Sequence, residues 1–377
     1  MIKNHLSTSH RLSWQGLLFV VACLLGLSTF LPLTSAAKPQ LDDLILSQPL
    51  AVIWRYPTDV TTDLTPAVDS HAAFVPLGAG VLIALNAADG KLLWRTENGG
   101  EFSAAPVADD RSVFVATGFT DQKQERGTLR AMSKATGVTL WMRTLTAPLA
   151  GGLACDGEAI FAGSRDGHVF AFDKRTGLII WSKQYAEQFA GQPVVVEGRV
   201  YIGSDSGVMR SLEAKTGDVA WQYKTGGAIR GAIAVSENIA YFGSADGNVY
   251  AFNGKKSKLV WHRRTGAAVE AVVAVENGVL ASSLDNFAYL LSLNKGALIW
   301  RRQLPGRISS RPMTAKEGAL FTPFSTDAAI VLNLKDGKPA NTLSLGEENS
   351  SAAAPVSVNN LVLITTPHAL VAFAAAH

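Results

Sequence analysis

Tryptophan recurs along this chain at an almost constant interval, and this regularity restricts the fold more than any other feature. Seven of the eight tryptophans are separated by 40, 47, 40, 40, 40 and 39 residues, and they are Trp54, Trp94, Trp141, Trp181, Trp221, Trp261 and Trp300. A period of about 20–50 residues is typical of solenoids, propellers and other repeat arrays. We therefore expect one structural unit to be repeated along most of the chain.

The residues around each tryptophan predict two antiparallel hairpins per repeat. Residues 172–181 and 212–221 each contain an apolar strand, a turn closed by glycine and a second strand that ends on tryptophan. Glycine supplies the positive φ that a tight hairpin turn needs. Another hairpin lies upstream, as at 200–208, and a further apolar strand at 193–196 precedes it. Four short antiparallel strands make a propeller blade, and no window has the apolar period of about 3.6 residues that a helical solenoid requires.

The chain ends determine how many blades are expected. Six intervals separate the first tryptophan from the last, and a degenerate repeat at 335–339 adds a seventh. The final segment has three predicted strands, at 354–358, 361–365 and 369–374, and residues 51–54 can supply its missing outer strand. We therefore predict an all-β fold, an eight-bladed β-propeller of four-stranded antiparallel blades that is closed by the N- and C-terminal strands. Closure removes the exposed strand edges that would otherwise invite aggregation.

The seven repeated tryptophans are predicted to be structural residues between blades. A ring on the outer strand can bury roughly 150–250 Å² against the neighbouring blade. The alternative is a set of separate aromatic platforms for ligands. The one long interval contains a polar insert at 121–127, which lengthens the middle hairpin of one blade. This insert is either a solvated loop or a contact for a partner.

Residues 1–37 are predicted to be a targeting segment. A weakly basic start precedes an apolar run at 17–33, and small residues at 34–37 suit cleavage by signal peptidase. An uncleaved anchor and a lipid attached to Cys23 are the alternatives. Residues 38–49 then form a predicted linker, and residues 50–377 form a single propeller domain. The chain is therefore expected to be exported, and the propeller is expected to be periplasmic or surface-facing.

Outside this segment the chain is close to neutral, with 32 basic and 31 acidic residues. A near-neutral body gives no global electrostatic argument for nucleic-acid binding. No later stretch approaches the 18 or so apolar residues of a membrane span, so membrane contact is expected only through a retained N-terminal anchor. Cys155 stands alone once the segment is cleaved, which excludes an intramolecular disulfide. We expect a monomer.

The pattern Asp-x-x-Thr-Gly-x-x-x-Trp at 173–181 resembles the pyrroloquinoline-quinone (PQQ) repeat, and the resemblance covers about residues 50–375. It differs from WD40 repeats because no Asp follows any of the repeated tryptophans. In one branch of this family, the quinoprotein dehydrogenases, the quinone is held on calcium against a disulfide of adjacent cysteines. This sequence has no adjacent cysteine pair. We therefore expect no cofactor, and a PQQ- and calcium-dependent dehydrogenase is the alternative.

A second branch, the outer-membrane β-barrel assembly propellers (BamB), resembles this chain in length and in its predicted export. The resemblance implies a non-enzymatic scaffold in the bacterial periplasm or at the periplasmic face of the outer membrane. It also implies that loops on one propeller face bind the barrel-assembly protein. An Arg-Gly loop between blades takes part in that family, and Ala228-Ile229-Arg230-Gly231 is similar to it.

Loops that join the tryptophan strand of one blade to the inner strand of the next converge near the central channel of a propeller. They include residues 101–102, 188–189, 229–230, 269–270 and 307–311. The residues that we select from them as candidates for binding a partner are Glu101, Ile229, Arg230, Glu270 and Arg307. Both signs of charge beside apolar residues suit peptide or protein docking. A solvated rim without a partner and a carbohydrate- or peptide-sensing module are the alternatives.

No catalytic residue and no metal ligand is predicted. The histidines show no His-Glu-x-x-His or similar spacing. Residues 203–207 resemble a nucleophile elbow with shifted letters, but they lie in a predicted β-hairpin. Asp166, Asp205 and Asp246 fall in hairpin turns and are assigned to turn chemistry.

Overall fold

The computed structural model describes residues 44–58, 61–121, 123–347 and 350–376. The predicted targeting segment at 1–37, with its cleavage site and Cys23, lies outside the described residues. Leu41–His377 form one compact unit of the chain. In the part of the chain that is described, no helix has the length and apolar character needed to cross a membrane.

The described residues contain 32 strands in eight groups of four, together with one short 3-10 helix, η1 (Gly78–Gly80). Blades 1 to 4 are β2(Ala67–Val68), β3(Ala72–Pro76), β4(Val81–Asn86), β5(Leu92–Glu97); β6(Glu101–Ala108), β7(Ser112–Asp121), β8(Gln124–Ser133), β9(Thr139–Leu145); β10(Leu149–Asp156), β11(Ala159–Ser164), β12(His168–Asp173), β13(Ile179–Gln184); and β14(Val194–Val196), β15(Arg199–Gly203), β16(Val208–Glu213), β17(Val219–Lys224). Blades 5 to 8 are β18(Ala234–Ser236), β19(Ile239–Gly243), β20(Asn248–Asn253), β21(Lys258–Arg264); β22(Val269–Val275), β23(Gly278–Ser283), β24(Phe287–Leu291), β25(Leu298–Gln303); β26(Met313–Thr314), β27(Gly318–Phe321), β28(Ala328–Asn333), β29(Pro339–Ser344); and β30(Val356–Val358), β31(Leu361–Thr366), β32(Ala369–Ala375), β1(Leu50–Pro57).

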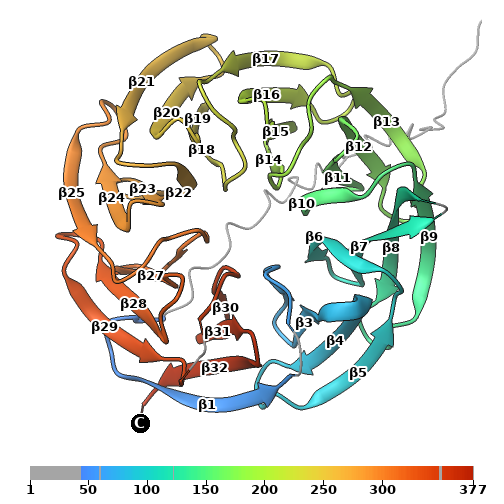
Figure 1. Cartoon of the computed structure of the whole chain (residues 1–377), viewed down its shortest axis with the longest axis horizontal. Coiled ribbons are helices and arrows are strands. Elements are labelled where there is room, and N and C mark those ends of the chain that lie inside the picture. The colour runs from blue at the N-terminus through green and yellow to red at the C-terminus, as the bar shows by residue number, and fades with distance from the viewer. Residues whose placement is uncertain (1–43, 59–60, 122, 348–349, 377) are drawn as a thin grey trace, which may run out of the picture. The chain divides into compact units, whose positions relative to one another are not determined.

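The blades are arranged around a common centre, with the first strand of each blade innermost and the fourth at the circumference (Figure 1). Strands pair antiparallel within each blade. Blades 2 and 3 are also joined to each other, because β6 and β10 pair in parallel at Ala104–Gly151 and Ala105–Gly152. The predicted all-β propeller of four-stranded antiparallel blades is confirmed.

Ring closure joins the first described strand to the last. β1 pairs antiparallel with β32 from Leu50–Ala375 to Pro57–Ala369, so that blade 8 takes its outer strand from the N-terminal side (Figure 1). The closing strand predicted at 51–54 is therefore confirmed, and it extends beyond both ends of that range.

Each of six tryptophan rings lies against a glycine in the outer hairpin of the next blade. A Cβ atom added at these glycines would lie 2.5 to 2.7 Å from the ring, and every one of them has a positive φ: Gly90, Gly137, Gly177, Gly217, Gly296 and Gly337. The same six indole nitrogens donate hydrogen bonds of 2.7 to 3.1 Å to backbone carbonyls of that hairpin. The structure thus places these rings at the junctions between blades. The outer strand does not end on tryptophan as predicted, because it continues to pair with the third strand; β13 runs beyond Trp181 to Gln184.

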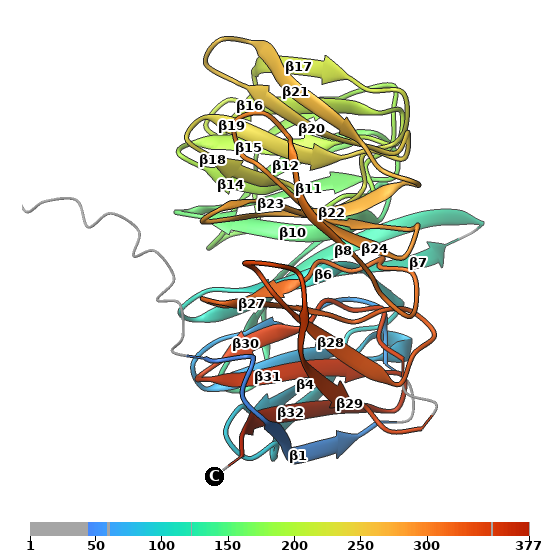
Figure 2. The same ribbon diagram turned by 90° about the vertical axis from the view of Figure 1, so that its left-hand side faces the viewer.

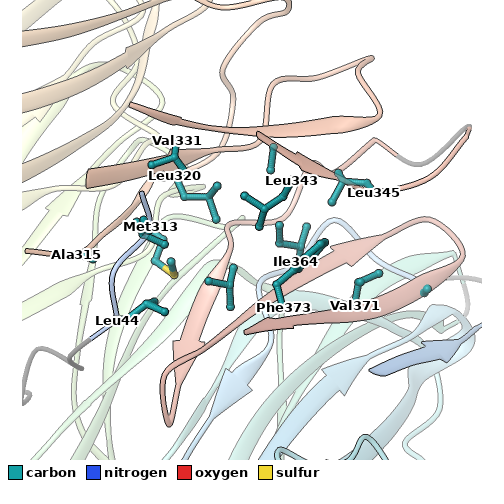
Figure 3. Close-up of a cluster of buried hydrophobic side chains, with 14 residues drawn as sticks. Leu44, Met313, Ala315, Leu320, Val331, Leu343, Leu345, Ile364, Val371 and Phe373 are labelled. Carbon is teal, nitrogen blue, oxygen red and sulfur yellow. The ribbon is translucent and has the colours of Figure 1, made fainter. Parts of the chain in front are cut away.

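The segment before β1 packs into the propeller. Leu44 and Leu46 are 5% and 0% exposed and belong to a core cluster between blades 7 and 8. Figure 3 shows Leu44 beside Met313 in this cluster. The side-chain amide of Asn341 also donates a hydrogen bond of 3.1 Å to the carbonyl oxygen of Leu46. The linker predicted at 38–49 is therefore wrong from Leu44 onward, because two leucines in this segment fill an inter-blade space.

The polar insert forms regular structure. β7 and β8 have ten residues each, and their pairing continues to Asp121–Gln124 at the tip. In Figure 2 this hairpin reaches farther than the other hairpins on its side of the propeller. It is a projecting arm of blade 2.

Candidate functional site

One face of the propeller carries the connections between blades together with the middle hairpin of each blade, and we call it the loop face. Backbone hydrogen bonds of 2.8 Å join the two kinds of segment, as from Thr225 to the Gly207 carbonyl and from Thr265 to the Gly247 carbonyl. These hydrogen bonds fix the backbone of the loops that carry the charged side chains of this face. The opposite face carries the outer hairpins, whose glycines receive the tryptophan rings.

Arg230 is held on the loop face by an ion pair with Asp205. Its Nε lies 2.7 Å from Oδ1 of Asp205, which belongs to the middle hairpin of blade 4, and the two side chains are 55% and 27% exposed. The hydrogen bond to this carboxylate raises the pKa of the Arg230 guanidinium. No described residue accepts a hydrogen bond from the two terminal nitrogens of Arg230. The guanidinium is therefore oriented and still has donors for an outside acceptor.

The residue after Arg230 brings two blades into backbone contact. A Cβ atom at Gly231 would lie 1.6 Å from the carbonyl oxygen of Glu270, so only glycine fits at this position. The next residue, Ala232, forms a parallel bridge with Ala271 of β22. The Arg-Gly step therefore seats the connection into blade 5 on the inner strand of blade 6, and it brings the Arg230 charge close to Glu270.

Two charged groups of the loop face lie in partly desolvated surroundings. Burial raises the pKa of Glu270, although the positive charge of Arg230 acts in the opposite direction. Burial also lowers the pKa of Arg311, whose side chain is nevertheless exposed to solvent. Partial desolvation strengthens the electrostatic interaction of these charges with a bound partner.

Three of the predicted candidate residues are placed differently from the prediction. Ile229 is 1% exposed and packs where a side chain at Gly203 would otherwise lie, so it anchors the loop and is not available to a partner. Glu101 is the first residue of β6, and Glu270 is the second residue of β22. Both therefore lie at the start of inner strands and not in the loops where they were predicted. Arg307 is exposed in the connection into blade 7, and its carbonyl oxygen accepts a hydrogen bond of 2.8 Å from Phe324.

A recess of about 570 Å³ opens beside Glu101 on the same face. The carboxylate of Glu101 is exposed and accepts a hydrogen bond of 3.0 Å from the backbone of Ala79 in η1. The projecting arm of blade 2 contributes Glu125, which lies 3.6 Å from Arg165 of blade 3. The insert thus forms one wall of a charged recess, which gives the loop face a second set of exposed charges.

Asp205 and Arg165 belong to the site but are not among the predicted candidates. The assignment of Asp246 to turn chemistry agrees with a hydrogen bond of 3.0 Å from the Asn248 backbone. Asp205 instead pairs with Arg230, in the connection that leaves its blade. The repeat pattern could have predicted this pair, because the middle hairpin of each blade lies beside the connection that leaves the blade.

The described residues contain no group of three or more His, Cys, Asp or Glu side chains that could hold a metal ion. Cys155 is a free, half-buried cysteine, and burial raises the pKa of its thiol. Cys155 is the one cysteine among the described residues, so this part of the chain contains no adjacent cysteine pair.

Comparison with known proteins gives one family match along most of the propeller. A family model described as "Outer membrane protein assembly factor BamB" matches residues 49–141 and 125–283, which together are more than half of the chain. The outer membrane protein assembly factor BamB of Shewanella oneidensis is 34% identical over 101 residues, 26% of this chain and 24% of that protein. The chain thus spans about a quarter of the length of this curated relative.

Two solved structures share the fold. The crystal structure of BamB from Moraxella catarrhalis has a TM-score of 0.73 and 16% identity, and the match covers 87% of this chain and 98% of that one. The computationally designed Ika8 protein has a TM-score of 0.74 and 17% identity, with 87% and 100% covered. At these identities the likeness concerns the fold alone.

Proposed function

The chain belongs to the family of the outer membrane protein assembly factor BamB, and from this premise we propose that it is a non-enzymatic scaffold in the assembly of outer-membrane β-barrel proteins. In this proposal the loop face binds a protein component of the assembly machinery. The propeller supplies a rigid frame, and the charges on its connections supply the recognition.

The observation that carries the proposal is the arrangement of Arg230, Asp205 and Glu270 around Gly231. The arginine is oriented before any partner arrives, so binding does not have to order its side chain. Its unused terminal nitrogens suit a carboxylate of the partner, while Glu270 offers the opposite charge in a partly desolvated position. Paired charges of both signs set partner choice and orientation more than raw affinity.

We also propose that residues 1–37 direct export and that the propeller works in the periplasm or at the periplasmic face of the outer membrane. Cleavage, lipidation at Cys23 and an uncleaved anchor remain three forms of this proposal. Mass spectrometry of the protein isolated from fractionated cells distinguishes them by the N-terminal residue and by any added lipid. Recovery of the intact, unprocessed chain from the cytoplasm would contradict export.

Site-specific photo-crosslinking tests the binding face. A photoreactive residue is placed at Arg230, Glu270 or Arg307 on the loop face, and at Lys215 or Lys255 in exposed outer hairpins of the opposite face as controls. The expected result is a crosslinked outer-membrane assembly protein from the loop-face positions and none from the controls. Equal crosslinking from both faces, or no product from any of the three loop-face positions, would overturn the proposal.

A matched pair of variants then tests the recognition charge. Arg230→Gln should weaken binding to the crosslinked partner roughly tenfold, because it removes one charge-assisted contact of about 1.4 kcal/mol. Arg95→Gln makes the same change at an exposed arginine on the outer strand of blade 1 and should leave the affinity unchanged. The dehydrogenase alternative is tested separately, by titrating the protein with PQQ and Ca²⁺ and following the quinone absorbance and dye reduction.

A further inference from the structure

A cleft of about 510 Å³ lies between blades 5 and 6, where their outer strands approach the loop face. Three exposed arginines line it: Arg263 and Arg264 at the end of β21, and Arg301 in β25. No described carboxylate pairs with any of the three. The Arg301 guanidinium lies 5.4 Å from the centre of the Phe287 ring, which supports it from one side.

The one carboxylate that lines this cleft already has its hydrogen-bonding partners. Oδ2 of Asp285 accepts bonds from the Tyr289 hydroxyl at 2.5 Å and the Gly266 backbone at 2.7 Å, and Oδ1 accepts one of 3.0 Å from the Phe287 backbone. These donors are neutral, and no ion pair joins this carboxylate to the three arginines. The lining therefore carries three positive charges against one negative charge.

The two preceding blade junctions show that the fold does not need these arginines. Between blades 3 and 4 the corresponding residues are Lys183, Gln184 and Gln222, and Lys183 is paired with Asp218 at 2.9 Å. Between blades 4 and 5 they are Tyr223, Lys224 and His262, and the Lys224 ammonium donates to the Ser206 carbonyl. Polar and singly charged side chains thus satisfy the same backbone. Neither of these two junctions carries the three arginines of the cleft between blades 5 and 6.

We propose that this cleft binds the phosphate headgroup of a lipid. Guanidinium groups donate paired hydrogen bonds to phosphate oxygens. A phosphomonoester carries about −1.5 to −2 charges at neutral pH, which matches the excess of two positive charges in the lining, whereas one carboxylate neutralises only half of it. The headgroup occupies the space among the three arginines.

The side chains next to the arginines favour a lipid as the source of the phosphate. Val260, Leu298 and Ile299 are 43%, 40% and 46% exposed on the same two outer strands. Exposed apolar residues recur around the rim of the propeller, but here they flank three arginines without carboxylate partners. An apolar strip beside positive charge is the arrangement that binds an anionic membrane surface. This contact needs no protein partner and adds a second membrane contact to the one predicted at the N-terminus.

Vesicle binding tests the proposal with the protein in the form isolated from cells. Vesicles of phosphatidylcholine with 20% phosphatidic acid are compared with vesicles of phosphatidylcholine alone, so that any binding through the N-terminal segment appears in both. We expect preference for the acidic vesicles, and we expect it to fall as salt is added.

The variant Arg264→Gln with Arg301→Gln introduces the residues that blades 3 and 4 carry at these positions. Each arginine near an anionic surface contributes about 1 kcal/mol, so this variant should lose roughly 30-fold in the preference.

The control variant is Arg95→Gln with Arg111→Gln, two exposed arginines elsewhere on the propeller, which removes the same charge and should keep the preference. Equal loss in both double variants would overturn the proposal, because it would mean that net charge alone attracts the vesicles. Titration with sodium phosphate forms the second arm. Saturable binding of free phosphate without preference for the acidic vesicles would overturn the assignment to a lipid, and binding of neither probe would overturn the site.

Discussion

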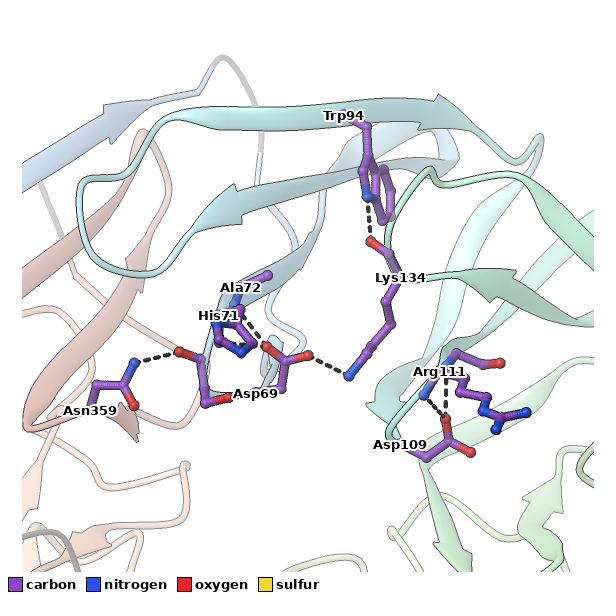
Figure 4. Close-up of polar contacts among 10 residues, drawn as sticks. Asp69, His71, Ala72, Trp94, Asp109, Arg111, Lys134 and Asn359 are labelled. Carbon is purple, nitrogen blue, oxygen red and sulfur yellow. Dashed lines mark hydrogen bonds and ion pairs between the residues drawn. The ribbon is translucent and has the colours of Figure 1, made fainter.

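The indole nitrogen of Trp94 donates a hydrogen bond of 2.7 Å to the backbone carbonyl oxygen of Lys134, across the junction between blades 1 and 2. The ammonium group of the same lysine returns to blade 1, where it lies 2.5 Å from Asp69 (Figure 4). Lys174 repeats the arrangement one blade later, since its carbonyl accepts from Trp141 and its ammonium pairs with Asp109. One residue thus fastens two blades at both of its ends.

Replacing Trp94 by Phe should destabilise the protein by about 1 kcal/mol, because the Lys134 carbonyl loses its donor while most of the ring packing remains. Trp221→Phe is the matched control. The Trp221 indole nitrogen is buried without a hydrogen-bond partner in the described structure, so its loss should be neutral or slightly stabilising. Urea unfolding followed by circular dichroism measures both changes. Equal destabilisation of the two variants would mean that the indole hydrogen bond contributes nothing.

Ser257 explains why Trp221 differs from the other rings. It occupies the hairpin position that is glycine in six other blades, and it has a φ of 47°. A Cβ atom there occupies the place that the tryptophan ring takes at the other junctions. Trp221 packs instead on Phe252, with ring centres 4.5 Å apart.

We therefore expect Ser257→Gly to stabilise the protein by about 0.5–1 kcal/mol, through relief of the left-handed backbone and of the crowded ring. Gly217→Ser makes the reverse change against Trp181 and should destabilise by more than 1 kcal/mol. Thermal and urea unfolding of the two variants give the sign directly. Destabilisation by Ser257→Gly would show that the ring is already relaxed in its present position.

The repeated parts of this fold are predictable because the same pattern of strands, glycine turns and tryptophan recurs in each repeat. The interval between tryptophans and the glycine turns predict the blades, and the count of repeats predicts that residues 51–54 close the ring. Ser257 shows the limit of that reasoning, since the hairpin keeps its shape with a different residue and changes the contact of Trp221.

Features that occur once are not predictable in the same way. Leu44 and Leu46 precede the first repeat, so no period indicates that they are buried. Ile229 and Arg230 are neighbours in one loop, but the curvature of the backbone buries the first and exposes the second. The partner of Arg230 lies in the preceding hairpin, and Arg301 meets Arg263 and Arg264 only across two blades. Each of these relationships depends on how blades stack, which the one-dimensional pattern does not contain.

The stability of the propeller should fall in acid through Asp69. Burial opposes its ionisation, but hydrogen bonds from Lys134 and from the His71 and Ala72 backbones lower the pKa of Asp69 below its ordinary value. A lowered folded-state pKa means that the stabilisation is present above about pH 3.9, the unfolded value, and is lost as the pH falls through the folded value.

Asp69→Asn should therefore cost about 1–2 kcal/mol at pH 7, and this cost should shrink progressively as the pH falls below about 3.9. Asp89→Asn is the control, since Asp89 pairs with Lys91 in an exposed hairpin and should change the stability little. Urea midpoints measured from pH 2 to 7 compare the two. A cost of Asp69→Asn that does not depend on pH would contradict an ionic contribution.

Tyr289 should resist ionisation in alkali. Burial and the hydrogen bond to Asp285 raise the pKa of Tyr289 to about 12. Because the folded-state pKa lies above the unfolded value of about 10, this stabilisation is complete below pH 10 and is lost as the pH rises through 12.

Tyr289→Phe should lose about 1–2 kcal/mol at pH 8 and converge with the parent protein above pH 12. Tyr223→Phe, which removes a hydroxyl without a described hydrogen bond, should lose less. Absorbance titration at 295 nm gives the ionisation of the phenol in each variant, and a Tyr289 that titrates near pH 10 would contradict the structure.

Leu46 tests where the folded domain begins. Its side chain is fully buried between blades 7 and 8, whereas that of Ile45 is 43% exposed. Leu46→Ala should destabilise by about 2–5 kcal/mol, because it leaves a cavity in a core cluster, and Ile45→Ala should change the stability by less than about 0.5 kcal/mol. Chemical unfolding of the two variants is the measurement. If the residues before β1 were a linker, neither alanine substitution would change the stability. A large effect of Leu46→Ala alone would mean that this segment is part of the folded core between blades 7 and 8.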